Sequence, residues 1–380
     1  MRRTIFEPEH DAFRETCRAF CESEIAPHHD EWEAAGIVPR DLWVRAGSLG
    51  LLGFDLQEAH GGAGVDDYRF NVVLDEELAR AGASGVGIPV HNDIVGPYLR
   101  TLATHEQQER WLPGFCAGTA IAAIAMTEPG AGSDLQSMQT TAVRDGAAYV
   151  VSGQKTFISN GINADLVIVA AKTDPDAGHR GISLFVVERG MPGFERGRNL
   201  DKIGLKAQDT AELFFDRVRV PAENLLGDEG RGFAALMDNL PRERLSIAVG
   251  SVAACERILS LTLEYVRERH AFGRPVGRFQ ANAFTLAELS TEVDVSRAYV
   301  DRCIAQHTAG TLGGVDAAKA KWWATELHKR LVDSCLQLFG GYGYMTEYPI
   351  AKAFVDARVR TIYGGTTEVM KEIVARSLDL

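Results

Sequence analysis

Three short apolar runs occupy the middle of the chain: Tyr149-Val150-Val151, Leu166-Val167-Ile168-Val169 and Leu184-Phe185-Val186-Val187. They are rich in β-branched and aromatic residues, which favour strands, and Asp145-Gly146 and Asn160-Gly161 supply turns. No helical pattern of about 10–15 residues separates one run from the next, which disfavours a parallel sheet built from βαβ units. Residues 121–230 are therefore predicted to form an antiparallel sheet or barrel.

Helical periodicity flanks this segment on both sides. Before it, Phe6, Phe13, Cys17 and Phe20 fall on one helix face, and Pro113-Gly114 marks a break just before the pattern changes. We expect an α+β multidomain chain, with an N-terminal α-helical domain over residues 1–120, a middle β domain over 121–230 and a C-terminal α-helical bundle over 231–380. The bundle is predicted from two long apolar stripes, Phe279, Ala283, Leu286, Leu289, Val293, Val300, Ile304 and Ala320, Ala324, Leu327, Leu331, Cys335, Leu338.

Composition and charge exclude several classes of protein. The 380 residues are 46% apolar and 24% charged, as in ordinary globular chains, and the net charge of −12 disfavours nucleic-acid binding. No run approaches the ~18 apolar residues of a membrane span, and no apolar signal core follows Met1, so a cytoplasmic protein is expected. The six cysteines include no C-x-x-C pair, which indicates reduced thiols. His28 and His29 are adjacent, so their side chains would point apart on a helix, and no metal site is expected there.

Several common catalytic motifs are missing from the sequence. There is no G-x-S-x-G elbow, and the Gly-Lys pair of a phosphate-binding P-loop never occurs. Four segments approach G-x-G-x-x-G, but each lacks the final glycine. A hydrolase, a P-loop nucleotide-binding protein and a nicotinamide-dependent enzyme are therefore disfavoured.

Two glycine-rich segments flank the β region and resemble the two signatures of the acyl-CoA dehydrogenase family. The first is Ala125-Met126-Thr127-Glu128-Pro129-Gly130-Ala131-Gly132-Ser133-Asp134, and the second is Gln337-Leu338-Phe339-Gly340-Gly341-Tyr342-Gly343-Tyr344. The segments 153–161, 269–273 and 362–366 also resemble blocks of that family, so the resemblance covers essentially the whole chain. It implies a helical domain, a small β-barrel-like domain and a C-terminal four-helix bundle, which agrees with the division drawn from periodicity.

The resemblance also implies FAD as the cofactor and a homotetramer, a dimer of dimers. Glycines permit close backbone approach to a cofactor, and arginine suits a pyrophosphate. By resemblance, one set of residues would contact the flavin and ribityl region within the subunit, a second set would hold the adenosine diphosphate part, partly across the dimer, and Thr366 and Glu368 would complete the site. The first set is Met126, Thr127, Ser133, Phe157, Ser159, and the second is Arg269, Phe272, Gln280, Gln337, Gly340, Gly341.

The implied reaction is αβ-desaturation of an acyl thioester, in which a base takes the α-proton and the β-hydrogen leaves as hydride to the flavin. In much of the family the base is a glutamate in a C-terminal Tyr-Glu-Gly-Thr segment, but this chain has Tyr363-Gly364-Gly365-Thr366 there. A backbone N–H at Gly364 can still polarise the thioester carbonyl. The isovaleryl- and long-chain-type enzymes carry their glutamate near the start of the first bundle helix, and Leu240-Pro241-Arg242-Glu243-Arg244-Leu245 resembles that arrangement. Glu243 is thus the expected base.

A structural alternative for Glu243 follows from its neighbour. If Pro241 is the first helical residue, Glu243 lies in the first turn, where the helix dipole favours any carboxylate. Ser133, Arg244, Tyr363 and Gly365 are expected to contact the substrate, although Arg244 could equally form an ordinary structural pair. The lack of a side chain at Gly364 should open space beside the α-carbon and admit branched or bulky acyl groups.

Three functions remain open at this point. The first is an acyl-CoA dehydrogenase that passes electrons to an electron-transfer flavoprotein, acting on an acyl-CoA or on an acyl group bound to a carrier protein. The second is a related flavin monooxygenase or oxidase, because family members with such activities also lack the usual glutamate. The third is a non-catalytic thioester-binding protein that has kept the fold alone.

Overall fold

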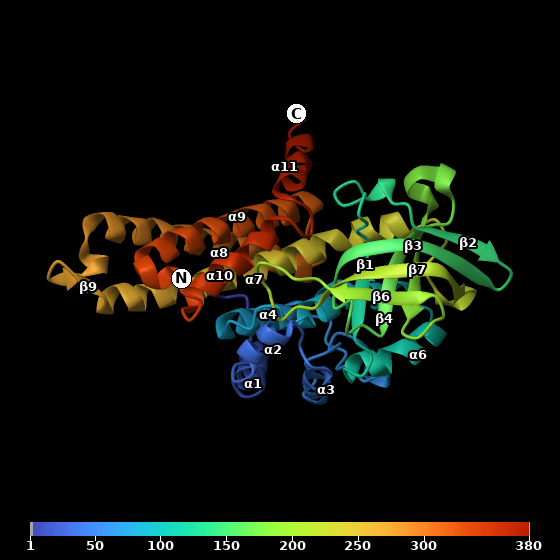
Figure 1. The fold of residues 1–380 in the computed structure, drawn as a ribbon, viewed down its shortest axis with the longest axis horizontal. Coiled ribbons are helices and arrows are strands. Elements are labelled where there is room, and N and C mark those ends of the chain that lie inside the picture. The colour runs from blue at the N-terminus through green and yellow to red at the C-terminus, as the bar shows by residue number, and fades with distance from the viewer. Residues whose placement is uncertain (1–2, 380) are drawn as a thin grey trace.

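The computed structural model describes residues 3–379, so residues 1, 2 and 380 of the expected terminal domains lie outside the described part. A layer of N-terminal helices packs beneath a long helix, α7 (Gly232–Glu268), with a β-sheet at one end of the molecule and the far end of a helical bundle at the other (Figure 1). The predicted order of helical, β and helical parts is confirmed.

The N-terminal part is built from helices joined by loops, with π-helical turns at η1 (Cys21–Ile25) and η3 (Val90–Val95). The prediction of a break at Pro113-Gly114 was wrong, because both residues lie inside the last turns of α6. The side chains of Trp111, Leu112 and Phe115 are buried there. Their packing offsets the cost of the backbone hydrogen bond that the proline removes. The α-helices of this part are α1 (Pro8–Phe20), α2 (His29–Ala35), α3 (Arg40–Ser48), α4 (Arg69–Ala81), α5 (Gly96–Leu102) and α6 (His105–Cys116).

The middle part forms one eight-stranded sheet in the described residues, with strand order β6-β7-β3-β2-β4-β5-β8 and β1 paired to β4. Most strand pairs are antiparallel, as expected, but the sheet is mixed, because β1 runs parallel to β4 and β2 touches β4 in parallel at one residue pair. Leu166–Lys172 is buried along almost its whole length because it lies between neighbours. The strands are β1 (Ala122–Ala125), β2 (Thr141–Asp145), β3 (Ala148–Ser159), β4 (Leu166–Lys172), β5 (Ile182–Glu188), β6 (Phe194–Asn199), β7 (Thr210–Pro221) and β8 (Leu225–Leu226).

The C-terminal part is a helical bundle around α7. Most residues of the two predicted apolar stripes are buried in this bundle, which confirms the prediction of helices in this region. By length and composition α7 could cross a membrane, but 67% of its most apolar window is buried inside the protein, as in the central helix of a bundle. The other elements are α8 (Gln280–Thr308), α9 (Gly314–Phe339), α10 (Pro349–Ala357) and α11 (Thr367–Arg376), with the short hairpin β9 (His270–Ala271) and β10 (Arg274–Pro275) between α7 and α8.

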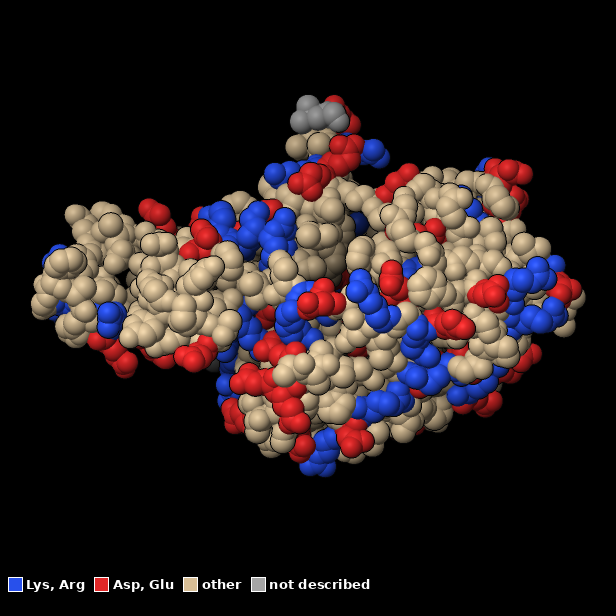
Figure 2. Space-filling view, viewed as in Figure 1, with Lys and Arg blue, Asp and Glu red and all other residues tan. Residues whose placement is uncertain are grey.

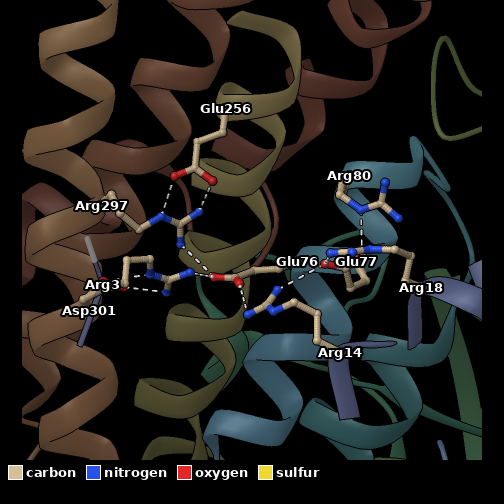
Figure 3. Close-up of polar contacts among 9 residues, drawn as sticks. All are labelled: Arg3, Arg14, Arg18, Glu76, Glu77, Arg80, Glu256, Arg297 and Asp301. Carbon is tan, nitrogen blue, oxygen red and sulfur yellow. Dashed lines mark hydrogen bonds and ion pairs between the residues drawn. The ribbon is translucent and has the colours of Figure 1, made fainter. Parts of the chain in front are cut away.

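An ion-pair network fixes the N-terminal helices to the bundle (Figure 3). Glu76 and Glu77 on α4 form its centre: Glu76 binds Arg3, Arg14 and Arg297, and Glu77 binds Arg14, Arg18 and Arg80. Since these arginines come from the N-terminus, α1, α4 and α8, the network holds four segments in one arrangement.

Candidate active site

Glu243 is a buried carboxyl group on α7, with 4% of its surface exposed. Tyr98 of α5 donates its hydroxyl to Glu243 Oε1 at 2.8 Å. Burial raises the pKa of Glu243 to about 7, against the smaller opposing effects of the Tyr98 hydrogen bond and the Arg244 charge. A carboxyl group with a pKa near neutrality can accept a proton efficiently at physiological pH.

Glu243 does not lie in the first turn of its helix, so the alternative drawn from Pro241 was wrong. The helix begins at Gly232 and continues through Pro241, which places Glu243 eleven residues beyond the start. The helix dipole acts within the first turn only, so it does not explain this carboxylate. Among the described residues, no arginine or lysine is hydrogen-bonded to Glu243. Because burying an unpaired carboxylate is costly, its position calls for a functional reason.

The Gly364-Gly365 turn lies against Arg244, the next residue on α7. Arg244 Nε donates to the Gly364 carbonyl at 3.4 Å, and Lys321 Nζ of α9 donates to the Gly365 carbonyl at 2.6 Å. Both glycines have positive φ, 67° and 97°, a conformation that side chains disfavour. Two buried cations therefore hold consecutive carbonyls of the turn predicted to bind the thioester.

The predicted open space at Gly364 is not found. A Cβ atom built at this glycine would overlap Ile247 Cδ1, from the turn of α7 that follows Glu243. Ile247 thus fills the volume in which a side chain at position 364 would begin, and the expectation that the glycine itself opens the pocket needs correction. No local pattern indicated this contact, because Ile247 and Gly364 are far apart in the chain.

Four of the residues predicted to contact the flavin come together where the loop after β1 meets β3. Thr156 N donates to the Thr127 carbonyl at 2.9 Å, and the buried Lys155 donates to the Met126 carbonyl at 3.0 Å and to Glu128 Oε1 at 2.8 Å. These bonds hold the loop with Met126 and Thr127 beside Phe157 and Ser159 on β3. Phe157 has a φ of 60° and is 69% exposed, so its ring points out of the core. Ser133 is exposed on the same loop.

The second predicted set lies at the far end of the bundle. Arg269 and Phe272 are on the α7–α8 connection, and Gln280 is the first residue of α8. The Arg269 guanidinium lies 5.6 Å from the centre of the ring of Tyr342, which follows Gly340 and Gly341. Gln337 belongs to the last turn of α9. This end carries β9, opposite the sheet in Figure 1, and the 37 residues of α7 between them span about 55 Å. Within one chain, the two sets cannot reach the same cofactor molecule.

The remaining predicted residues lie around α11. Thr366 caps this helix by accepting from Val369 N at 3.3 Å, and Glu368 is in the first turn, where the pKa of its carboxyl is lowered by its own backbone N–H and by Thr366. Tyr363 is 37% exposed next to the Gly364-Gly365 turn. In Figure 2 the surface is hollowed between the base of α11 and the sheet.

Sequence reasoning missed three residues that shape the site: Tyr98, Ile247 and Lys321. Each contacts a predicted site residue from a distant part of the chain, Tyr98 being 145 positions before Glu243. A lysine that is 0% exposed is unusual, but its burial cannot be seen in a sequence.

One cluster of potential metal ligands is present in the described part of the chain: His29, Asp30 and Glu33. Lys352 Nζ lies 2.8 Å from His29 Nδ1 and 3.0 Å from Glu33 Oε2. An ammonium group thus already provides the positive charge at this cluster.

Comparison with known proteins identifies the family. Three family models match: the N-terminal domain of acyl-CoA dehydrogenase over residues 7–119, the middle domain over 123–218 and the C-terminal domain over 230–378. The mitochondrial long-chain specific acyl-CoA dehydrogenase of Rattus norvegicus is 52% identical over 99% of this chain and 88% of its own length. The mitochondrial isovaleryl-CoA dehydrogenase of Solanum tuberosum is 37% identical over 98% of this chain and 91% of its own.

The fold comparison agrees with the sequence comparison. The crystal structure of an acyl-CoA dehydrogenase from Geobacillus kaustophilus superimposes with a TM-score of 0.97 at 52% identity, covering 99% of each chain. The chain therefore belongs to the acyl-CoA dehydrogenase family of flavin-dependent oxidoreductases that act on CH–CH groups.

Proposed function

We propose that this chain dehydrogenates an acyl-CoA thioester to the trans-2-enoyl thioester, with Glu243 as the base that takes the α-proton. The observation that supports this most strongly is the buried Glu243 carboxyl, whose pKa of about 7 suits proton abstraction at neutral pH. Membership of the family and the missing glutamate at Gly364 point to the same residue.

The other residues of the site position the reacting groups. Arg244 and Lys321 hold the two carbonyls of the Gly364-Gly365 turn, so the Gly364 N–H can be aimed at the thioester oxygen and stabilise negative charge there. Tyr98 fixes one oxygen of Glu243 and leaves the other free to accept the proton. The burial of Glu243 and Arg244 keeps water from the α-carbon.

The residues present fit an FAD. When bound, the flavin would take the β-hydrogen as hydride. Gly130, Gly132, Gly340 and Gly341 each face open space where a Cβ would point, as close approach to a cofactor requires. Met126, Thr127, Ser133, Phe157 and Ser159 would hold the flavin and ribityl part, and Thr366 and Glu368 would complete the site.

A second copy of the chain is needed for this cofactor site. Arg269, Phe272, Gln280, Gln337, Gly340 and Gly341 lie at the opposite end of the molecule, so they would bind the adenosine diphosphate part of the partner's FAD. Phe272, Tyr342 and Tyr344 at this end are 95%, 45% and 84% exposed. Exposed aromatic side chains favour association, and we propose a homotetramer built as a dimer of dimers.

The substrate and the electron acceptor follow from the family. Electron-transfer flavoprotein is the proposed acceptor, in the cytoplasm, although the rat relative is mitochondrial. A branched or bulky acyl group remains our expectation for the substrate, now on the ground that the base approaches from α7 rather than from position 364.

Anaerobic titration with straight and branched acyl-CoA esters tests the proposal. Bleaching of the flavin band, with the trans-2-enoyl-CoA as product, is the expected result. A flavin that no thioester bleaches, or that reacts rapidly with oxygen once reduced, would favour a carrier-protein-bound substrate or a monooxygenase or oxidase instead. A protein that cannot be loaded with FAD would exclude the flavoenzyme reading.

A further inference from the structure

Five lysine and arginine side chains are buried in the described part of the chain, and two of them differ from the rest. Three lie within 3.2 Å of a carboxylate oxygen: Lys155, Arg242 and Arg297. The other two, Arg244 and Lys321, are 7% and 0% exposed, and neither forms an ion pair within residues 3–379. Because a buried charge without a countercharge is costly, their positions need an explanation beyond packing.

The partners of these two cations are backbone carbonyls of a single turn. Arg244 Nε donates to the Gly364 carbonyl at 3.4 Å, and Lys321 Nζ donates to the Gly365 carbonyl at 2.6 Å. A carbonyl oxygen accepts a hydrogen bond, but it carries no net charge. The hydrogen bonds therefore leave two positive charges unbalanced at the Gly364-Gly365 turn.

The carboxylates that act on Lys321 do not neutralise it. They are Glu326 and Glu368, and neither lies within ion-pair distance of Lys321 in the described chain. Glu326 is instead paired with Lys329 at 2.6 Å, and Glu368 is exposed. Burial and the Arg244 charge outweigh both carboxylates and lower the pKa of Lys321 to about 8. This lowered pKa agrees with a cation whose charge is poorly compensated.

The same turn presents free hydrogen-bond donors beside the two cations. Among residues 3–379, the N–H groups of Gly364 and Gly365 have no acceptor. A Cβ atom built at Gly364 would lie 3.9 Å from Lys321 Cε, and one built at Gly365 would lie 3.8 Å from Arg244 Nη2. The N–H group that is proposed to meet the thioester oxygen is thus flanked by both cations.

Proton abstraction would move a negative charge toward these cations. When the α-proton passes from carbon to a Glu243 oxygen, the electron pair of the C–H bond is shared with the thioester oxygen, and Glu243 becomes neutral. Before this step the Glu243 carboxylate supplies a negative charge near Arg244, whose pKa it raises against the larger effect of burial. After the step the negative charge lies at the turn. Two unpaired cations at the turn favour that second state.

We propose that the charges of Arg244 and Lys321 stabilise the enolate form of the bound thioester and so make its α-proton more acidic. This inference rests on the proposed function, because it places the thioester oxygen at the Gly364 N–H. Both are positioning residues that act through the turn, but their charge contributes as well as their hydrogen bonds. Because the un-ionised thioester has no net charge, the two cations favour the ionised form over the bound substrate.

An ester that can lose its α-proton but has no β-hydrogen tests this inference. In 3-thiaoctanoyl-CoA a sulfur atom replaces the β-carbon, so no hydride can follow the proton. In the FAD-loaded enzyme, an enolate beside the oxidised flavin gives a long-wavelength absorption band, whose amplitude at pH 8 measures the ionised fraction of the bound ester. The same titration gives the dissociation constant. The wild type should ionise the ester, whereas Glu243→Gln should bind it without ionising it.

Two pairs of variants separate charge from hydrogen bonding. Lys321→Gln and Arg244→Gln keep a donor but lose the charge, whereas Lys321→Arg and Arg244→Lys keep the charge. Each glutamine variant should lower the ratio of ionised to neutral bound ester about tenfold or more, since an opposite charge about 4–6 Å away shifts a pKa by roughly one unit or more. The charged variants should stay within about threefold of the wild type. Lys319→Gln, on the opposite side of α9, is the matched control and should leave the ratio unchanged.

The outcomes separate this inference from the proposed function. Glutamine variants that ionise the ester as the wild type does would overturn the inference, and so would charged variants that lose as much as the glutamine variants. In both cases the proposed function stands. If the Lys321 variants do not fold, the Arg244 pair decides the question alone. A wild-type enzyme that binds the ester but does not ionise it would overturn the proposed base and this inference together.

Discussion

Asp75, Glu76 and Glu77 follow one another on α4, but they lie in opposite surroundings. Glu76 and Glu77 face arginines from the N-terminus, α1, α4 and α8 (Figure 3). Asp75 faces Ser246 and Asp93 on the inner side, where Glu243 also lies and where Tyr98 and Ser246 contribute hydroxyl groups. All these carboxyl groups are buried, so burial alone does not distinguish them.

The difference appears in the pKa values of Glu77 and Glu243. Burial opposes ionisation of Glu77, but hydrogen bonds from Arg18, Arg80 and Arg14 outweigh it and lower its pKa. For Glu243 burial prevails, and the pKa rises to about 7. The arginine-bound carboxylates thus serve to hold helices together, whereas Glu243, which has no arginine hydrogen-bonded to it, can exchange a proton near neutral pH.

The largest effect is expected for Glu243→Gln. The amide keeps the shape and removes the proton acceptor, so the rate of anaerobic flavin reduction by an acyl-CoA should fall by roughly 10²–10⁴-fold or more while FAD remains bound. Glu77→Gln makes the same change among the arginines and should leave the rate within about twofold. A rate for Glu243→Gln within tenfold of the wild type would remove Glu243 from the mechanism.

Gly364→Glu is expected to lower stability and to give no working second base. A side chain there requires a positive φ and overlaps Ile247, and such overpacking costs about 1–3 kcal/mol. Thermal unfolding should show a lower Tm, and Ile247→Ala in the same chain should recover part of it. If Gly364→Glu instead unfolds like the wild type and restores flavin reduction to Glu243→Gln, the site has room that the structure does not show.

Glu77→Gln should cost stability rather than activity. We expect a loss of about 1–3 kcal/mol in the free energy of unfolding, reduced from the value for a fully buried pair because Arg18 and Arg80 are partly exposed. Since the pKa of Glu77 is lowered in the folded state, its contribution is present above the unfolded value of about 4.3 and is lost as the pH falls through the folded value. Urea unfolding at pH 7 and below pH 4 measures this: a gap between wild type and variant that stays constant with pH would contradict it.

The smallest effect is a shift in the pH dependence of Tyr98→Phe. The Tyr98 hydroxyl stabilises the ionised form of Glu243, so its removal should raise the pKa of that group further. A hydrogen bond to a charged group is worth about 1.5–3 kcal/mol, which corresponds to roughly one to two pH units. The midpoint of the pH–rate profile for flavin reduction should move upward by about that amount; a midpoint that stays in place would show that the bond does not affect Glu243.

Much of the fold could be predicted from the sequence, because strand and helix periodicity are local. The α, β, α order and the buried stripes of α8 and α9 follow from spacing alone. The predictions of a break at Pro113 and of a helix start at Pro241 were wrong, because packing of neighbouring side chains can keep a proline inside a helix. The parallel pairing of β1 with β4 depends on a contact between distant segments, which no local pattern encodes.

The candidate site residues were proposed where family motifs mark them. Glu243 was proposed as the base because a glutamate precedes Arg244 while Gly364 replaces the usual base. Its pKa, the Tyr98 bond and the overlap at Ile247 arise from tertiary packing and had no signal in the sequence.

The most direct test of the central claim is the pH dependence of flavin reduction. The second-order rate constant for anaerobic reduction by an acyl-CoA that the enzyme oxidises would be measured from pH 5 to 9 with the FAD-loaded wild type. Because the proposed base must be ionised, the rate constant should rise with pH and level off above a midpoint of about 7, following a single deprotonation. A rate constant that is flat across this range, or that has its midpoint near the ordinary value for glutamate of about 4.3, would contradict the assignment of Glu243.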